Sequence, residues 1–141
     1  VLPEYRGCPA KRVIDFSCGN GVLLELFRHY GHQVLGVDIQ YFAFLRSQGI
    51  PYITHDCRVL PYPPGAGVCD LVTCVGAIST YGELPWGEVL SEFARIAREC
   101  FVVVPNQGEI LDARRGELEG WRRSGWQRHK VRHAYKWCRD G

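Results

Sequence analysis

Three aspartates and two glycines have the spacing of a cofactor site. Asp15 ends an apolar run, Asp38 ends a second run 23 residues later, and Asp56 ends a third. Gly19 and Gly21 follow the first run, where small residues let a ligand approach the backbone closely. A carboxylate at the end of a second strand can accept hydrogen bonds from both hydroxyls of a ribose. One acid alone would more simply cap a turn or helix, but three beside the glycines predict a nucleoside cofactor.

Two common nucleotide-binding patterns do not match this sequence. A dinucleotide turn needs a small residue three positions after its second glycine, and the corresponding position holds Leu24. A phosphate loop of the form G-x-x-x-x-G-K-S/T is also missing. A cofactor without phosphates fits better, with an adenosine, a ribose for Asp38 and a cationic end suited to acids. A nucleotide-dependent oxidoreductase stays as an alternative, against which Leu24 argues.

Strand and helix patterns that alternate along the chain must position these residues. The predicted strands are 11–16, 33–38, 51–56, 69–75, 100–105 and 126–138. The predicted helices are 21–30, 41–49, 85–98 and 108–124. This alternation predicts an α/β fold, a doubly wound, mostly parallel sheet with helices on both faces. Ligands of such sheets bind beyond the carboxyl ends of the strands, so the three aspartates should share one crevice.

Taken together, these motifs resemble the class I S-adenosylmethionine-dependent methyltransferases. The first motif of that family, D-x-G-x-G-x-G, reads here Asp15-Phe16-Ser17-Cys18-Gly19-Asn20-Gly21, so Ser17 replaces the first glycine. The later motifs follow in the family's order across about residues 11–106, as GVDIQ, HDCRVLPY, CDLVTCV and an E-x-x-R-I helix at 92–96. The resemblance implies a Rossmann-like methyltransferase fold with S-adenosylmethionine as cofactor. No metal is expected, because the sequence lacks the close-spaced ligand pairs of a zinc site.

The resemblance also implies a role for each motif residue. Asp15 would lie near the amino group of the methionine moiety, and Asp38 would bind the ribose hydroxyls. Asp56 would accept a hydrogen bond from the adenine amino group, while the backbone N–H of Cys57 would donate one to the ring. The predicted cofactor-binding set is Asp15, Ser17, Cys18, Gly19, Gly21, Asp38, Ile39, Asp56, Cys57 and Val75.

The methyl acceptor should contact the loops after the fourth and fifth predicted strands. By resemblance, the segment VGAISTY favours a small molecule, since the N-P-P-Y type of motif linked to bases or glutamine is missing. Methyl transfer from a sulfonium needs alignment and exclusion of water more than a fixed triad. The candidate catalytic groups are Tyr81, Glu83 and Asn106, each of which could equally be an ordinary polar loop residue.

The basic end of the chain leaves two other functions open. Residues 112–141 carry nine Arg or Lys against four Asp or Glu, whereas residues 1–111 carry eight against eleven. The segment Arg114–Arg139 would suit an RNA-modifying methyltransferase, although a charged edge strand explains it more simply. Ser17 and the short C-terminus are the support for a third function, a non-catalytic S-adenosylmethionine-binding regulatory domain.

Length and composition predict one domain in a reducing compartment. The 141 residues divide into an N-terminal extension (1–10), a cofactor-binding core (11–106) and a C-terminal helix and basic strand (107–141). The family's seventh strand has no clear counterpart, so the fold is expected to be truncated or rearranged there. Seven cysteines without a C-x-x-C pair predict free thiols in the cytoplasm. The sequence has no apolar run of membrane-spanning length and no recognisable signal peptide.

Overall fold

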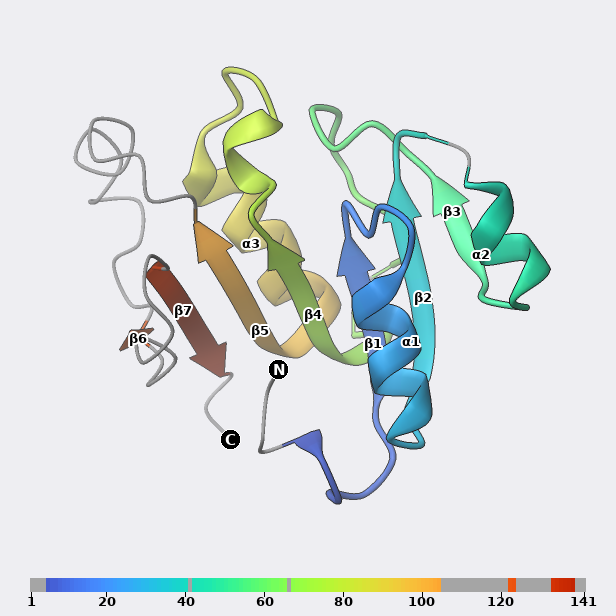
Figure 1. Ribbon diagram of the computed structural model, residues 1–141. Coiled ribbons are helices and arrows are strands. Elements are labelled where there is room, and N and C mark those ends of the chain that lie inside the picture. Colours follow the sequence, from blue (N-terminus) through green and yellow to red (C-terminus); the bar gives the residue numbers. More distant parts are fainter. Residues whose placement is uncertain (1–4, 41, 66, 105–121, 124–132, 139–141) are drawn as a thin grey trace.

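A mixed sheet forms the centre of the computed structural model, which describes residues 5–40, 42–65, 67–104, 122–123 and 133–138. Within these residues the sheet has seven strands in the order β3-β2-β1-β4-β5-β7-β6 (Figure 1). The five parallel strands are β1 (Arg12–Phe16), β2 (Gln33–Asp38), β3 (Tyr52–Thr54), β4 (Cys69–Val75) and β5 (Ala97–Val104). Antiparallel to β5 lies β7 (His133–Cys138), which also pairs with the two-residue β6 (Arg122–Arg123).

Helices cover both faces of the sheet, as the doubly wound prediction requires. On one face lie α1 (Val22–His29) and α2 (Ala43–Ser47), whose buried side chains join a cluster that includes Leu71 and Phe101. On the other face lies α3 (Trp86–Ile96), which buries its apolar stripe in a second cluster that includes Val72. Apolar clusters on both faces of β4 explain why its sequence is apolar apart from Asp70 and Thr73.

All five parallel strands end at the same edge of the sheet. In Figure 1 this is the upper edge, where the loops after β1, β3 and β4 come together. The chain moves outward from β1 through β2 to β3, and then crosses to β4 on the other side of β1. Strand order therefore reverses between β1 and β4, and the crevice at such a point is the usual ligand site of open α/β sheets.

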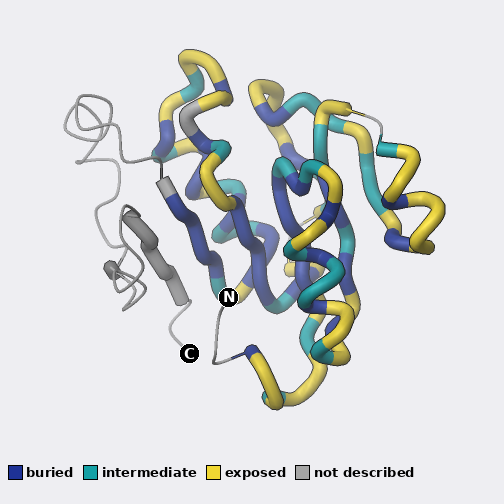
Figure 2. The backbone as a smooth tube through the Cα atoms, viewed as in Figure 1, coloured by how far each residue is buried: buried dark blue, intermediate teal, exposed yellow. Residues whose placement is uncertain are grey.

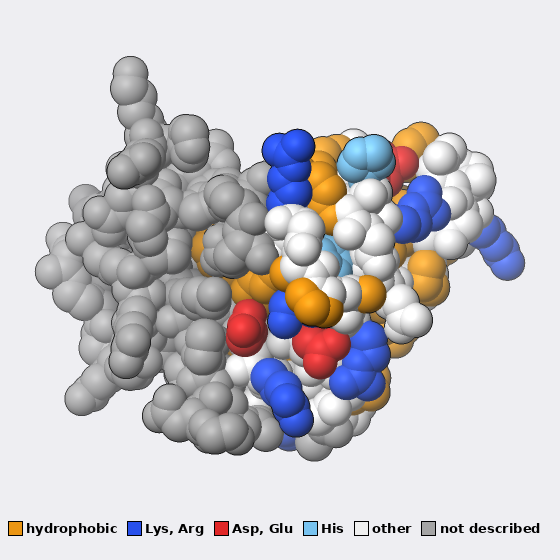
Figure 3. All heavy atoms as spheres, turned by 90° about the horizontal axis from the view of Figure 1, so that it is seen from below, with side chains coloured by type: hydrophobic (Ala, Val, Ile, Leu, Met, Phe, Trp, Pro, Cys, Tyr) orange, Lys and Arg blue, Asp and Glu red, His pale blue; other side chains and the backbone are white. Residues whose placement is uncertain are grey.

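At the opposite edge of the sheet, an ion pair joins the starts of β1 and β4. Arg12 at the start of β1 donates its backbone N–H to Asp70 at 2.8 Å and pairs with it through Nε at 3.5 Å. Figure 3, which views this edge, shows basic and acidic side chains together on the described surface. Behind them β1 and β4 are almost wholly buried (Figure 2).

Several predicted boundaries are wrong, and one affects the site. The third strand was expected to reach Asp56 but ends at Thr54, so Asp56 lies in the following loop. The helix expected at 85–98 ends at Ile96, because Ala97 takes an extended conformation and starts β5.

The C-terminal elements also differ from expectation where the structure describes them. The strand expected at 126–138 is described only as β7, and 126–132 lie outside the described residues. Of the helix expected at 108–124, the described residues Arg122–Arg123 form strand β6 instead. The sequence left open whether a seventh strand is missing or rearranged; the described residues include seven strands, and the last two, β6 and β7, pair antiparallel.

Close packing of α1 on β2 makes Gly36 a sensitive position. A Cβ there would lie 2.7 Å from Cys18 Sγ and 2.9 Å from Leu24 Cδ1. We expect Gly36→Ala to lower the free energy of unfolding by about 1–3 kcal/mol, the usual cost of overpacking. Urea denaturation measures this directly.

The matched control is Gly87→Ala in α3, where an added Cβ meets no atom within 4 Å. That variant should be unchanged or more stable by about 0.5–1 kcal/mol, because alanine favours helix. Equal behaviour of the two variants would contradict the packing described.

Candidate cofactor-binding site

The turn from β1 into α1 is held by the end of β2. The backbone N–H groups of Ser17 and Cys18 both donate to the carbonyl of Val37, at 2.6 and 3.2 Å. Gly19 and Gly21 have φ values of +55° and +83°, which glycine adopts without strain. We call residues 17–21 the cofactor turn.

Open backbone at Gly19 leaves room for a ligand. A Cβ built on Gly19 would meet no atom within 4 Å. Helix α1 begins after Gly21 without a side-chain cap, so the N–H groups of its first turn have no capping side chain. Such a helix start can bind a polar or negatively charged group of a ligand.

Asp38 joins the end of β2 to the cofactor turn. Its Oδ2 accepts the N–H of Gly19 at 3.0 Å, and its Oδ1 accepts the N–H of Gln40 at 3.0 Å. These two bonds fix the plane of the carboxylate. Each oxygen retains a lone pair, so the group can still accept two hydroxyls.

Asp15 lies deeper, inside β1, and is buried. Only 4% of its surface is exposed, and Thr73 of β4 donates its hydroxyl to Asp15 Oδ1 at 2.7 Å. Burial raises the pKa of Asp15 from 3.8 to about 7; the Thr73 hydrogen bond opposes this rise and the nearby Asp38 adds to it. A cation placed beside Asp15 would therefore convert a partly protonated group into a carboxylate.

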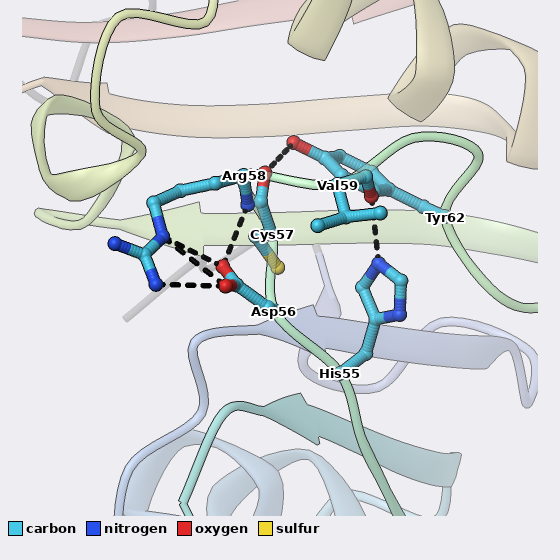
Figure 4. Close-up of polar contacts among 6 residues, drawn as sticks. All are labelled: His55, Asp56, Cys57, Arg58, Val59 and Tyr62. Atoms are coloured by element: carbon cyan, nitrogen blue, oxygen red, sulfur yellow. Dashed lines mark hydrogen bonds and ion pairs between the residues drawn. The ribbon is translucent and has the colours of Figure 1, made fainter.

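Asp56 has a different environment in the loop after β3. Figure 4 shows its carboxylate facing Arg58, with Nη2–Oδ2 at 2.8 Å and Nε–Oδ1 at 3.0 Å. The side-chain and backbone hydrogen bonds from Arg58 lower the pKa of Asp56 to about 2. Beside it the carbonyl of Cys57 accepts the Tyr62 hydroxyl at 2.6 Å, and His55 bonds to the Val59 carbonyl. Asp56 is thus ionised across the whole physiological pH range.

A cavity of about 290 Å³ opens between α1 and the ends of β1, β4 and β5. Its lining is mainly apolar: Asp15, Ser17, Cys18, Asn20, Val22, Leu23, Leu26, Val75, Phe101 and Val103. Four of the predicted cofactor residues, Asp15, Ser17, Cys18 and Val75, therefore share one cavity. The other predicted residues do not line it and are Gly19, Gly21, Asp38, Ile39, Asp56 and Cys57.

The candidate catalytic residues are placed unequally. Tyr81 is 4% exposed and lies against the cofactor turn, where its hydroxyl is 2.6 Å from Ser17 Oγ. Burial raises its pKa well above the ordinary 10, so the hydroxyl is a poor base. Glu83 is exposed on the same loop, and Asn106 lies outside the described residues.

Two groups that shape the site were not found by sequence reasoning. Thr73 was visible as the one hydroxyl residue inside the apolar run CDLVTCV, a signal for a buried partner. Arg58 was visible two residues after Asp56. By contrast, nothing local in the sequence indicates that Phe101 and Val103, far along the chain, line the cavity.

Two further observations limit the kinds of site that the described residues can form. Among them, no group of three or more His, Cys, Asp or Glu residues is arranged to hold a metal ion. No helix within the same residues has the length and apolar character needed to cross a membrane.

A family comparison places this geometry among known proteins. Residues 14–108, well over half of the chain, match a family model described as a methyltransferase domain. The match includes the whole of the cofactor turn, Asp38 and Asp56. No curated protein matches the chain in sequence.

Solved structures share the fold at low identity. A TehB-like S-adenosylmethionine-dependent methyltransferase from Corynebacterium glutamicum has a TM-score of 0.70 at 15% identity, covering 94% of this chain and 83% of that one. A Burkholderia thailandensis 1,6-didemethyltoxoflavin-N1-methyltransferase, with 1,6-didemethyltoxoflavin and S-adenosylhomocysteine bound, has a TM-score of 0.68 at 12% identity, covering 94% of this chain and 72% of that one. An S-adenosylmethionine-dependent methyltransferase from Mesorhizobium loti has a TM-score of 0.60 at 20% identity, covering 73% of this chain and 52% of that one. The chain thus spans about half the length of the last protein.

The buried carboxyl of Asp15 makes a testable prediction about stability. Because its folded pKa is about 7 and its ordinary value 3.8, the folded chain binds more protons between these pH values. The wild type should therefore lose stability as pH rises through this window. Asp15→Asn should not show this loss. Between pH 4 and 7.5 its free energy of unfolding, relative to that of the wild type, should therefore rise by at least about 1.4 kcal/mol, the equivalent of one pKa unit.

Urea denaturation at several pH values provides the measurement, with Asp70→Asn as the control. Hydrogen bonds from Arg12 lower the pKa of Asp70, so its contribution to stability is lost as pH falls. The two variants should change the pH profile in opposite directions. Identical profiles for wild type and Asp15→Asn would refute the assigned environment of Asp15.

Proposed function

Because the chain belongs to the methyltransferase domain family, whose cofactor is S-adenosylmethionine, we propose that it transfers the cofactor's methyl group to a small-molecule acceptor. The sulfonium of this cofactor supplies an already activated methyl group. What the protein must add is a defined position for both reactants and protection from water.

The described residues fit the parts of the cofactor. Asp38, whose plane is fixed by Gly19 and Gln40, would accept the ribose hydroxyls. Asp15 would lie by the amino group of the methionine moiety, inside the cavity that it lines. The loop residues Asp56 and Cys57 would meet the adenine. The open space over Gly19 is the feature that lets a ligand lie between these groups.

The observation that carries the methyltransferase proposal is the cavity beside the cofactor turn. Its volume of about 290 Å³ suits the amino acid end of the cofactor next to Asp15, and side chains such as Val75 and Leu26 would exclude water from it. The Burkholderia methyltransferase, whose structure holds 1,6-didemethyltoxoflavin together with S-adenosylhomocysteine, supports a small-molecule acceptor. The RNA hypothesis rests on Arg114–Arg139, most of which lies outside the described residues.

Proton removal, where the acceptor needs it, has few candidates among the described residues. Glu83 is exposed on the loop after β4, and an exposed carboxylate there can accept a proton from an incoming acceptor. Tyr81 is buried and serves less well, while Asn106 stays a candidate for positioning.

We also propose a reducing, cytoplasmic setting for this single domain. Five of the described cysteines are buried and form no disulfide: Cys18, Cys57, Cys69, Cys74 and Cys100. Burial raises the pKa of Cys18, Cys69 and Cys74 to about 12, which keeps these thiols protonated and unreactive.

Calorimetric titration with S-adenosylmethionine tests the cofactor assignment. We expect Asp38→Ala to weaken binding by about 1–3 kcal/mol, because the ribose hydroxyls lose their carboxylate acceptor. Asp70→Ala is the control, since Asp70 also accepts a backbone N–H but lies at the opposite edge of the sheet. It should leave the affinity unchanged.

Three results would count against parts of the proposal. Equal affinities of wild type and Asp38→Ala would remove Asp38 from the ribose site. Binding of NADH in place of S-adenosylmethionine would point to the oxidoreductase alternative, and salt-sensitive RNA binding would favour the RNA acceptor.

A further inference from the structure

Ser17 adopts a backbone conformation that normally favours glycine. Its φ is +58°, and among the described residues it is the one non-glycine with a positive φ. An L-residue pays a steric penalty in this region that glycine avoids. The family's glycine would therefore fit the turn more easily, and the serine side chain must make a contact that offsets its strain.

The contact is with Tyr81, 64 residues further along the chain. Ser17 Oγ and the Tyr81 hydroxyl are 2.6 Å apart, and the Cys74 thiol lies 3.5 Å from the same hydroxyl. The Tyr81 ring also packs edge-on against Tyr62, with centroids 6.5 Å apart. Tyr81 thus sits between the loops that follow β1 and β3.

The neighbouring residue, Gly82, brings the same loop close to a second segment. A Cβ on Gly82 would lie 3.4 Å from Cδ of Arg58, so the Arg58 side chain passes close over Gly82. The guanidinium of that arginine holds Asp56, as Figure 4 shows. The loop at 76–85, between β4 and α3, therefore lies against both segments that carry the candidate cofactor residues, the turn after β1 and the loop after β3. We call it the acceptor loop, because the acceptor is expected there.

We propose that Tyr81 is a positioning residue, which couples the acceptor loop to the cofactor turn through its hydroxyl bond with Ser17. The proposal rests on the proposed function, and deepens it by joining cofactor binding to the arrangement of the acceptor side. A ligand that restricts the motion of the backbone at Ser17 also restricts the Tyr81 hydroxyl, because the two residues are hydrogen-bonded. The acceptor loop, which carries Tyr81, is then restricted as well. Glycine in place of Ser17 could not transmit this, since it has no hydroxyl.

Hydrogen exchange with and without S-adenosylmethionine tests the coupling, with affinity measured by calorimetry on the same samples. In wild type the cofactor should slow exchange of the amides of Thr80, Tyr81 and Leu84, which are hydrogen-bonded within the acceptor loop. Tyr81→Phe and Ser17→Ala should still bind, roughly threefold to tenfold more weakly, the range of one buried hydrogen bond. In both variants the cofactor should no longer slow exchange in the loop.

The double variant and a matched control complete the design. Ser17→Ala with Tyr81→Phe should bind no more weakly than either single variant, because both remove the same bond. Tyr5→Phe is the control: it removes a buried hydroxyl that bonds to Glu99 at 2.6 Å, away from the site. It should keep both the affinity and the cofactor-dependent protection.

The outcomes separate the coupling from the cofactor assignment. Cofactor-dependent protection that persists in Tyr81→Phe, or losses of affinity that add in the double variant, would overturn the coupling and leave the cofactor in place. A wild type that does not bind S-adenosylmethionine would overturn both. Urea denaturation of wild type, the two single variants and the double variant, all without ligand, gives an independent test. Shifts in the urea midpoint that add in the double variant would show that the two hydroxyls do not interact, and would also overturn the coupling.

Discussion

The site depends on the way in which the end of β2 holds the turn after β1. Parallel pairing sets Phe16 opposite Val37, so the carbonyl of Val37 meets the N–H groups of Ser17 and Cys18. The next residue, Asp38, then accepts the N–H of Gly19. Three hydrogen bonds, accepted by two consecutive residues of β2, fix the turn before any ligand arrives, which lowers the ordering cost of binding. The same strand end also supplies the carboxylate that would recognise the ribose.

Differences in environment give the three aspartates different electrostatic roles. Asp56 is held ionised by Arg58, with a pKa of about 2, whereas burial brings the pKa of Asp15 to about 7. A cationic ligand would draw Asp15 into its charged form, and its departure would let the group take up a proton again. The protein can therefore release such a ligand without leaving an unpaired carboxylate buried beside β4.

Much of this arrangement was predictable because it is local in sequence. The apolar runs identified the parallel strands, the small residues identified the turn, and Asp38 was correctly expected at the end of β2. The missed features depend on contacts between distant segments, such as Thr73 on Asp15 and Tyr81 on Ser17. Boundaries failed where pairing competes with helix propensity. Ala97 continues a helical pattern, but its pairing with Cys69 draws it into β5.

A crystal structure of the chain with S-adenosylhomocysteine tests the central claim most directly. The account predicts that the adenosyl group lies over Gly19, with its ribose hydroxyls on the Asp38 carboxylate and its amino acid end in the cavity beside Asp15. A ligand bound elsewhere on the chain, or a ribose that makes no contact with Asp38, would contradict it.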